Sequence, residues 1–560
     1  MAKSEKSGYL NAAMLMLVSG VVVKVIGAVY KIPLTAFIGA VGRGYFAAAY
    51  NLYMPLHAVL LGSFPIALSR LVSMALAQQN ANRAVALQRS SFGLFLFAGL
   101  IGSAVIAAAA VPYAVYVAGT TKCVFTALVL APSLLFSMLA ACYRSYFEGC
   151  MNMVPTAVSQ LLEAVFKMLL GLLFAKAAMT YLSGQYMLEG AVPGTAVASE
   201  EKALSEIYPL TSAAAMLGVT AGSLLSFGYT WVYFRRHRLK YNCCLPPRQG
   251  RRELLQFAFP IMLSSAVQSV FQFLDTASVQ RALASVPAAQ LRAVYDSGLH
   301  AVGVADADLV TYTYGLFSTA LDFKNLVPGI TMVLGVCAVP AVCREYEQGN
   351  RERTGILINA VMKYTVLLSV FLSAAVFMTA ETLLQLFYGS SAPDVAEGCA
   401  PLVRSFALTL PLYSLASTAV FSVQALGKPS RSVVPYAVSG IVRVVLNYSL
   451  VGGTLLLQGA VVSGAVGYLL LSVSNLVITY RLAKCPPDAV NVFVKPCGVG
   501  IVSVIVCRLL PEVRFLSGHL LIHLLMKSVV FAVVFCMLCF TCRAVDFEEI
   551  ISVFKKKKMA

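Results

Sequence analysis

The chain has 560 residues, of which 59% are hydrophobic and only 12% are charged, and its mean hydropathy is +0.80. About a quarter of the residues are charged in an ordinary soluble domain, so this composition excludes a soluble globular protein. The 42 Lys and Arg residues against 24 Asp and Glu residues give a formal net charge of +18. Because the basic residues gather between apolar stretches, we attribute the excess to membrane topology and anionic lipid headgroups, and we expect no nucleic-acid partner.

About fourteen apolar stretches follow one another along the chain, and each reaches or exceeds the ~20 residues that a transmembrane helix needs. The predicted helices span 9–32, 44–77, 91–118, 122–147, 155–181, 207–234, 254–280, 309–343, 358–388, 401–426, 432–453, 458–483, 491–510 and 518–543. The second and eighth are longer than a simple span, so we expect bends at Pro55, Pro65 and Pro328. The sequence therefore predicts an all-α polytopic membrane protein.

Lysine and arginine occupy every second gap between the predicted spans, and this bias marks the cytoplasmic side of a membrane protein. The richest basic gap runs from Arg235 to Arg252, and the C-terminal tail contains Lys555–Lys558. The gap 182–206, on the opposite side, carries glutamates at positions 189, 200, 201 and 206. An even number of spans then places both termini in the cytoplasm of a protein of the cell membrane.

An internal repeat divides the chain. The segments 149–167 and 427–447 each contain a helix exit, a short polar loop and a proline that opens the next span. From these prolines onward the segments align without a gap, with Pro155 opposite Pro435. Both copies cross the membrane in the same direction, which indicates a parallel repeat.

The repeat predicts two pseudo-symmetric six-helix lobes, at residues 1–240 and 241–484. The remaining segment, 485–560, is predicted to hold two additional helices and a basic cytoplasmic tail. At the same offset Glu163 falls opposite Arg443, so equivalent helix faces of the two lobes carry opposite charges.

Ionisable side chains within the predicted spans are the candidates for function. Each costs about 3 kcal/mol to insert and therefore faces a cavity or a partner. Basic residues outnumber acidic ones in the spans, and the candidate cavity cations are Lys24, Arg70, Lys324, Arg404 and Arg443. A cavity lined in this way favours an anionic ligand, whereas proton or cation antiporters place carboxylates at the centre.

Two acids within the spans, Glu163 and Asp275, are candidates for binding a coupling cation. For Glu163 an ion pair with Lys167 is the alternative, because residues four apart share one helix face. The chain has no phosphate-binding glycine-rich loop followed by lysine, so we expect neither an ATPase site nor a cofactor. We also expect no metal site, and no enzymatic activity.

Two N-terminal motifs carry a family resemblance. The run GAVYKIPLTAFIGAVGRGYFAAAYNLY (27–53), followed by GSFPIALSRLVS (62–73), resembles the polysaccharide-biosynthesis branch of the multidrug/oligosaccharidyl-lipid/polysaccharide (MOP) exporter superfamily. More narrowly, it is similar to the stage V sporulation protein B group and its lipid II flippase relatives. Residues 260–279 and 322–336 are similar to the seventh and eighth spans of that family.

This resemblance implies fourteen helices in two lobes, alternating access through a central cavity, and a lipid-linked sugar pyrophosphate as the substrate. It implies cavity cations only at the matching positions, Lys24, Arg70 and Lys324, and a lipid-tail groove formed with helices 13 and 14. The chain departs from the family where Met74 replaces a common glutamate. The expected function is a flippase that moves an undecaprenyl-pyrophosphate-linked oligosaccharide or peptidoglycan precursor, driven by a coupling cation, the membrane potential or downstream consumption.

Two other functions compete with the flippase. A cation-coupled multidrug antiporter of the same superfamily usually has twelve spans and a carboxylate-centred lobe, so the basic surplus and the two added helices count against it. A non-transporting membrane scaffold that recruits wall-synthesis enzymes during sporulation would gain nothing from charges placed in mid-membrane.

The predicted orientation is testable by cysteine labelling of intact cells in an otherwise cysteine-free background. A cysteine introduced by Ser199→Cys should react with a membrane-impermeant maleimide, because the gap 182–206 is predicted to lie outside. The native Cys243 and Cys244 should react only after permeabilisation. Labelling of the latter pair in intact cells would reverse the topology.

Overall fold

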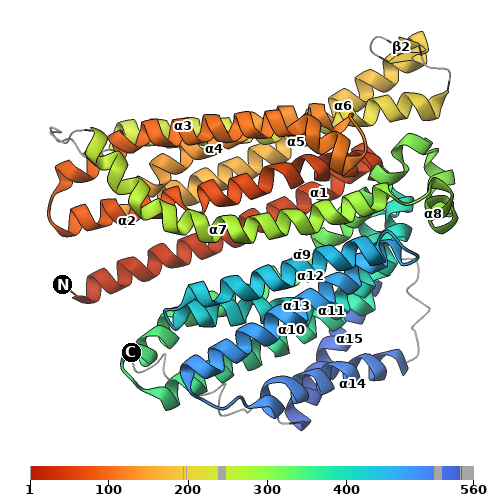
Figure 1. Ribbon diagram of the computed structural model, residues 1–560. Helices are drawn as coiled ribbons and strands as arrows, with labels where there is room; N and C mark the ends of the chain where they lie inside the picture. Colours follow the sequence, from red (N-terminus) through yellow and green to blue (C-terminus); the bar gives the residue numbers. More distant parts are fainter. Residues whose placement is uncertain are drawn as a thin grey trace. The chain divides into compact units, whose positions relative to one another are not determined.

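The computed structural model describes residues 2–192, 195–196, 199–237, 247–509, 520–542 and 544. In chain order its longer helices are α1 (Ala2–Leu61), α2 (Phe64–Ala77), α3 (Ala81–Tyr113), α4 (Cys123–Gly149), α5 (Val154–Glu189), α6 (Glu200–His237), α7 (Pro247–Ala284), α8 (Ala288–Val302), α9 (Leu309–Glu347), α10 (Arg351–Tyr388), α11 (Pro393–Ala425), α12 (Val433–Leu450), α13 (Leu456–Ala483), α14 (Lys495–Leu509) and α15 (Leu520–Thr541). Short helical turns are η1 (Ala114–Ala118), η2 (Asp306–Asp308), η3 (Pro429–Ser432) and η4 (Val490–Val494). Strands β1 (Ala191–Val192) and β2 (Thr195–Ala196) pair antiparallel at the tip of the α5–α6 hairpin, beyond the ends of the neighbouring helices (Figure 1).

The helices are long and apolar enough to cross a membrane. Twelve such stretches occur among the described residues, and the first, Val18–Ala77, contains 60 residues. At 1.5 Å per residue that length is about three times the ~30 Å hydrocarbon layer, so it accommodates the first two predicted spans. Each of the fourteen predicted ranges overlaps a helix, and 309–343 lies within the 39-residue α9. Residue 510 of the thirteenth range, residues 518, 519 and 543 of the fourteenth, and the predicted basic tail Lys555–Lys558 lie outside the described residues. The predicted all-α polytopic membrane fold is confirmed.

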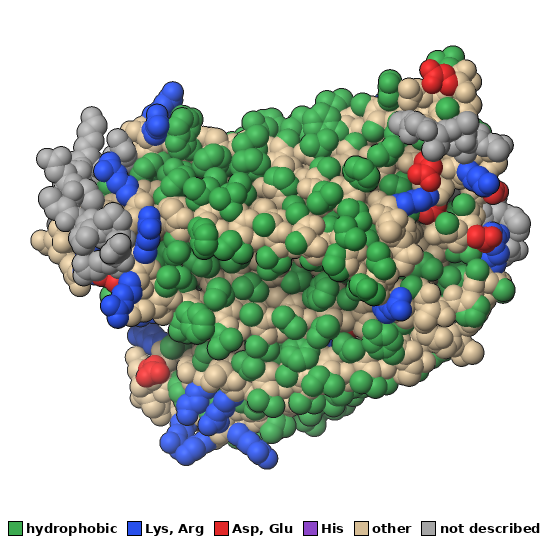
Figure 2. Space-filling model, turned by 45° about the horizontal axis from the view of Figure 1, so that its top comes forward, with side chains coloured by type: hydrophobic (Ala, Val, Ile, Leu, Met, Phe, Trp, Pro, Cys, Tyr) green, Lys and Arg blue, Asp and Glu red, His purple; other side chains and the backbone are tan. Residues whose placement is uncertain are grey.

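The surface of the helices also fits a bilayer. On the face shown in Figure 2, hydrophobic side chains cover the middle of the helices, while charged side chains gather toward their ends. Helix α15 exposes more than half of each of Leu521, Leu525, Val529 and Met537, which follow one another at multiples of four residues along the helix. A stripe of this kind would be an aggregation site in water, but in a membrane it contacts lipid tails.

Helix α1 departs from the predicted loop at 33–43. It continues from Ala2 to Leu61, and its only non-helical residue is Gly39, at φ 62° and ψ −175°. Glycine alone adopts this conformation without strain. The helix resumes immediately after Gly39, so one residue replaces the expected loop.

The second predicted span is interrupted between α1 and α2, at Gly62 and Ser63. Pro65 lies in the first turn of α2, where its missing N–H would have no intrahelical acceptor in any case. The helices do not end at the other two expected bends, since α1 continues through Pro55 and α9 through Pro328.

The internal contacts define two units, one ending at Ser318 and one beginning at Thr319. In the first unit, α4 packs on α3 and α6, α5 packs on α6 and α1, and α7 packs on α1, α2 and α3. In the second, α11 packs on α10 and α13, α12 packs on α13, and α14 and α15 pack on α10. The contact boundary therefore lies within α9, whereas the lobe boundary at 240/241 stays a prediction from the repeat.

The two repeat copies have the same local geometry. In the first, α4 ends at Gly149 and α5 begins with Val154 and Pro155. In the second, α11 ends at Ala425. Helix α12 begins at Val433, two residues before Pro435. In both, the helix that carries the proline packs on the next helix, as α5 on α6 and α12 on α13.

Helices α1 and α9 approach each other backbone to backbone within the first unit. A Cβ atom at Gly44 would lie 2.0 Å from the Thr311 carbonyl oxygen, and one at Gly315 would lie 1.9 Å from the Ala40 carbonyl oxygen. Beside this contact, the Tyr45 hydroxyl donates a 2.6 Å hydrogen bond to the Asp308 carboxylate. Glycine at both positions is therefore a requirement of the packing.

This contact predicts a difference between two glycines of α1. Gly44→Ala should lower the melting temperature of the purified protein and its yield, because overpacking a tight contact costs about 1–3 kcal/mol or more. Gly27→Ala is the matched control, since a Cβ there meets no atom within 4 Å. Equal melting temperatures for the two variants would contradict the close approach of α1 to α9.

Candidate functional site

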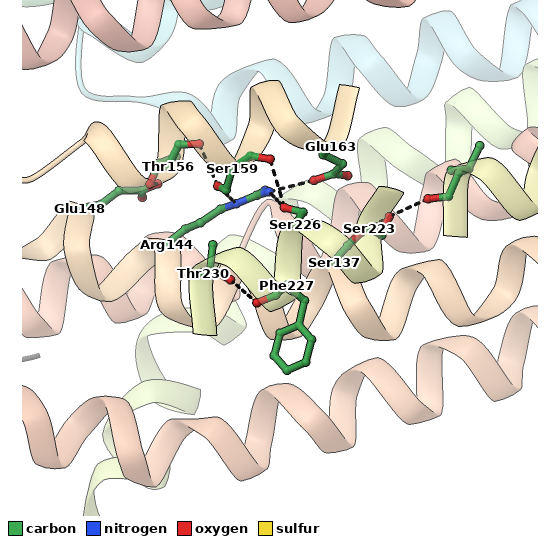
Figure 3. A network of polar contacts seen from close by, with 11 residues as sticks. Ser137, Arg144, Glu148, Thr156, Ser159, Glu163, Ser223, Ser226, Phe227 and Thr230 are labelled. Atoms are coloured by element: carbon green, nitrogen blue, oxygen red, sulfur yellow. Dashed lines mark hydrogen bonds and ion pairs between the residues drawn. The ribbon is translucent and has the colours of Figure 1, made fainter. Parts of the chain in front are cut away.

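A buried ionic network joins α4, α5 and α6 (Figure 3). The Arg144 guanidinium of α4 pairs with the Glu163 carboxylate of α5 at 2.8 Å. Its Nε donates to the Ser159 hydroxyl at 2.7 Å, and Nη2 donates to the Ser226 hydroxyl of α6 at 2.5 Å. A charge buried within the spans is stabilised in this way by an opposite charge and by hydroxyl oxygens together.

The network corrects the expected pair of Glu163 and Lys167. The carboxylate of Glu163 pairs with Arg144 instead, while the ammonium of Lys167 donates a short hydrogen bond to the Tyr50 hydroxyl of α1 and lies 4.9 Å from the Tyr50 ring centroid. The spacing correctly placed the two residues on one face. The neighbouring helices α4 and α1 determine their partners.

Arg144 was missing from the predicted set of charges within the spans. It lies three residues before the end of the predicted 122–147 span, and it is only 8% exposed. The sequence signal was its position inside an otherwise apolar stretch. Because the Arg144 guanidinium pairs with the Glu163 carboxylate, the geometry favours a structural ion pair at this place. The role of Glu163 in binding a coupling ion stays a prediction.

A second polar network lies in the first unit and includes α7. Asn51 of α1 donates to the hydroxyls of Tyr314 (2.9 Å) and Tyr113 (3.3 Å), and the Tyr113 hydroxyl donates to the Gln280 side chain (2.6 Å). Asp275 is half-buried on α7 and interacts electrostatically with Tyr314. The network links α1, α3, α7 and α9, and it is the setting in which Asp275 would bind a coupling cation.

In the second unit, Lys324 lies among three aromatic rings. It is 7% exposed, and its Nζ lies 5.2 Å from the ring centroid of Phe406, 5.5 Å from that of Tyr413 and 5.0 Å from that of Tyr468. The rings of Tyr413 and Tyr468 stack at 4.3 Å with an angle of 18° between their planes. The negative faces of such rings attract an ammonium group, so the site can hold a positive charge inside the membrane.

Arg443 approaches the same ring from α12. Its Cζ lies 4.8 Å from the Tyr468 centroid, so the two charges are at most about 10 Å apart. At that separation and an effective dielectric constant of ~20 they repel each other by roughly 2 kcal/mol. We call the set Lys324, Arg443, Tyr413 and Tyr468 the cation–tyrosine cluster.

Of the other predicted cations, Lys24 and Arg70 lie in the first unit and Arg404 lies in the second. Lys24 is exposed on α1, and Arg70 is exposed on α2 with its Cζ 5.0 Å from the ring centroid of Phe257 of α7. Arg404 forms an exposed ion pair with Glu381 at 2.7 Å. The structure thus brings together Lys324 and Arg443 but not Arg404. Among the described residues, no three His, Cys, Asp or Glu side chains lie close enough to hold a metal ion.

Comparisons with known proteins agree with this architecture. Residues 315–449 match the MatE family model. Stage V sporulation protein B of Bacillus subtilis is 22% identical over 90% of this chain and 88% of its own length. The lipid II flippase MurJ of the same organism is 20% identical over 80% of this chain and 78% of its own length.

Solved structures show the same fold. A lipid II flippase MurJ in an inward closed conformation superposes with a TM-score of 0.65, at 14% identity, over 95% of this chain and 99% of that one. An inward-facing multidrug-resistance MATE-family transporter of the MOP superfamily superposes with a TM-score of 0.60, also at 14% identity, over 81% of this chain and 94% of that one.

The buried network predicts an asymmetry between single and double substitutions. Arg144→Met should destabilise the protein by up to about 3 kcal/mol, because it removes the guanidinium that pairs with the partly buried Glu163 carboxylate. The double variant Arg144→Met with Glu163→Leu should recover most of the lost melting temperature. Additive losses in the double variant would show that the two side chains do not act as a pair.

Proposed function

Because the chain is a stage V sporulation protein B-like member of the MOP exporter superfamily, related to lipid II flippases, we propose that it moves a lipid-linked sugar pyrophosphate across the cytoplasmic membrane. The proposed substrate is an undecaprenyl-pyrophosphate-linked oligosaccharide or peptidoglycan precursor, carried from the inner to the outer leaflet by alternating access. The protein is a multi-pass membrane transporter, and we propose the identity of its substrate.

The cation–tyrosine cluster is the observation that carries this proposal. Two basic side chains on separate helices, Lys324 and Arg443, converge on the Tyr468 ring. A ligand of opposite charge would be attracted to both side chains at once. A pyrophosphate fits because a lysine attracts it as a point charge and an arginine can bind its oxygens through two parallel hydrogen bonds.

The lipid part of the substrate needs no comparable site. A polyprenyl tail remains in the hydrocarbon phase while its headgroup crosses, and the exposed apolar faces of the helices contact the same phase. Lys24 and Arg70, both exposed on the first two helices, are proposed as further cations along the headgroup's route. The membrane potential supplies about 2.3 kcal/mol per charge for each 100 mV, enough to bias the return of an empty, positively charged site.

The proposal predicts different effects for three basic residues of the second unit. Lys324→Ala and Arg443→Ala should each reduce transport at least about tenfold, which corresponds to about 1.4 kcal/mol of lost binding. Arg404→Ala should leave transport near normal, because Arg404 forms an exposed pair with Glu381, and exposed pairs contribute little.

The measurement is leaflet-resolved quantification of lipid-linked wall precursors, in cells that depend on each variant at matched expression. Precursor accumulation in the inner leaflet with the first two variants, and not with Arg404→Ala, would support the flippase. An unchanged leaflet distribution after depletion of the wild-type protein would favour the scaffold. If depletion of the wild-type protein instead abolished cation-coupled drug export, the antiporter would be favoured.

A further inference from the structure

A pocket of about 440 Å³ lies between α2 and α7 in the first unit. It is lined by Phe64 of α2 and by six residues of α7 between Leu255 and Met262, and Gln256 is the only polar residue among these seven. We propose that this α2–α7 pocket binds one acyl chain of an anionic phospholipid, whose headgroup phosphate contacts Arg252. The proposal does not depend on the proposed function, since the cation–tyrosine cluster belongs to the second unit.

The lining of the pocket fits a lipid chain. Leu255 and Phe259 are 45% and 59% exposed, whereas Ala258 is buried, so the pocket combines side chains that reach the surface with one that does not. A lipid tail is already in an apolar phase, and entering the pocket therefore gains packing contacts but little hydrophobic free energy. A preference for one kind of lipid must come from the headgroup.

Arg252 lies about one turn before the pocket, on the same face of α7. Residues spaced by three, four and seven positions share a helix face, so Arg252 is aligned with Leu255, Gln256 and Phe259. The segment from Arg252 to Met262 rises about 15 Å, which is half of the ~30 Å hydrocarbon layer. With Arg252 at the level of the headgroups, the pocket lies within one leaflet, at the depth of an acyl chain.

The arginines at this end of α7, which begins beside the α2–α3 turn (Figure 1), have different partners. Arg83 of α3 pairs with Glu253 at 3.0 Å, and the Nε atom of Arg251 donates to the Ser90 carbonyl oxygen at 3.1 Å. Arg252 is exposed, so its guanidinium can reach a lipid phosphate. Basic sites between transmembrane helices on the cytoplasmic side bind anionic headgroups, and the predicted orientation places this end of α7 in the cytoplasm.

Gln256 favours a phospholipid over a polyprenyl lipid. It lies on the Arg252 face about 6 Å deeper along the helix, and its side-chain amide can donate two hydrogen bonds. The ester carbonyls of a phospholipid lie just inside its phosphate, and they accept such bonds. A polyprenyl pyrophosphate has only hydrocarbon at that depth, so it would leave the amide without a partner from the ligand.

Native mass spectrometry of the purified full-length protein, titrated with phosphatidylglycerol or phosphatidylcholine, tests the headgroup contact. The wild-type protein should bind one phosphatidylglycerol saturably, about fivefold more tightly than phosphatidylcholine, as expected for one arginine near a headgroup. Arg252→Gln should remove this preference, and Arg252→Lys should retain it. Arg236→Gln is the matched control, because Arg236 is an exposed arginine of α6, and it should leave the preference unchanged.

A pair of tryptophan substitutions tests the apolar part of the pocket. Leu255→Trp should fill it and weaken the saturable binding of both phospholipids by about tenfold or more. Leu263→Trp is the control, since Leu263 is 58% exposed on α7 but does not line the pocket. If Leu255→Trp fails to fold, the Arg252 series decides, because Arg252 is exposed and lies outside the lining.

Three results would overturn the proposal: no saturable site for phosphatidylglycerol, equal losses in the Arg252→Gln and Arg236→Gln variants, or equal losses in the two tryptophan variants. Undecaprenyl pyrophosphate is titrated as well, because the Cζ atom of Arg70 lies 5.0 Å from the ring of Phe257, next to the pocket. If Leu255→Trp abolished the binding of that lipid, the pocket would belong to the substrate and not to a phospholipid. Unchanged binding of undecaprenyl pyrophosphate to the variant would keep the two sites separate.

Discussion

The cost of placing a charge inside the hydrocarbon layer constrains everything else in this protein. The chain meets that cost in two ways. Arg144 is neutralised internally, by the carboxylate of Glu163 and by the hydroxyls of Ser159 and Ser226. Lys324 lies among aromatic rings, which attract its charge. The first arrangement joins three helices of the first unit, and the second brings an ammonium and a guanidinium group to one tyrosine ring of the second unit.

The internal repeat allows the two arrangements to be compared at equivalent positions. Glu163 on α5 and Arg443 on α12 occupy equivalent positions after the aligned prolines, and both helices pack on the helix that follows. The serines at the aligned positions 159 and 439 both hold neighbouring groups by hydrogen bonds. The two copies have kept the same packing scheme while their charges diverged, so the first unit contains a closed ionic network and the second the cation–tyrosine cluster.

Much of the fold was predictable because apolar runs of the length of a bilayer are a strong, local signal. The same signal does not report single-residue breaks, so the kink at Gly39 and the interruption at Gly62 were not found at their actual positions. The mid-span position of Lys324 was also visible in the sequence, as an expensive charge in an apolar run.

The partners of these charges were not predictable. The rings around Lys324 come from α11 and α13, more than 80 residues further along the chain, and no spacing rule connects them. The alternative that paired Glu163 with Lys167 fails for the same reason. Helical periodicity identifies a shared face, but α4, a neighbour in space, supplies the guanidinium that binds it.

The most direct measurement compares the affinity of the purified protein for undecaprenyl pyrophosphate and for undecaprenol, which has the same tail without the anionic group. An anion site built on Lys324 and Arg443 predicts at least about a hundredfold preference for the pyrophosphate, since two charge-assisted contacts contribute roughly 1.5 kcal/mol or more each. Equal affinities for the two lipids would contradict the account.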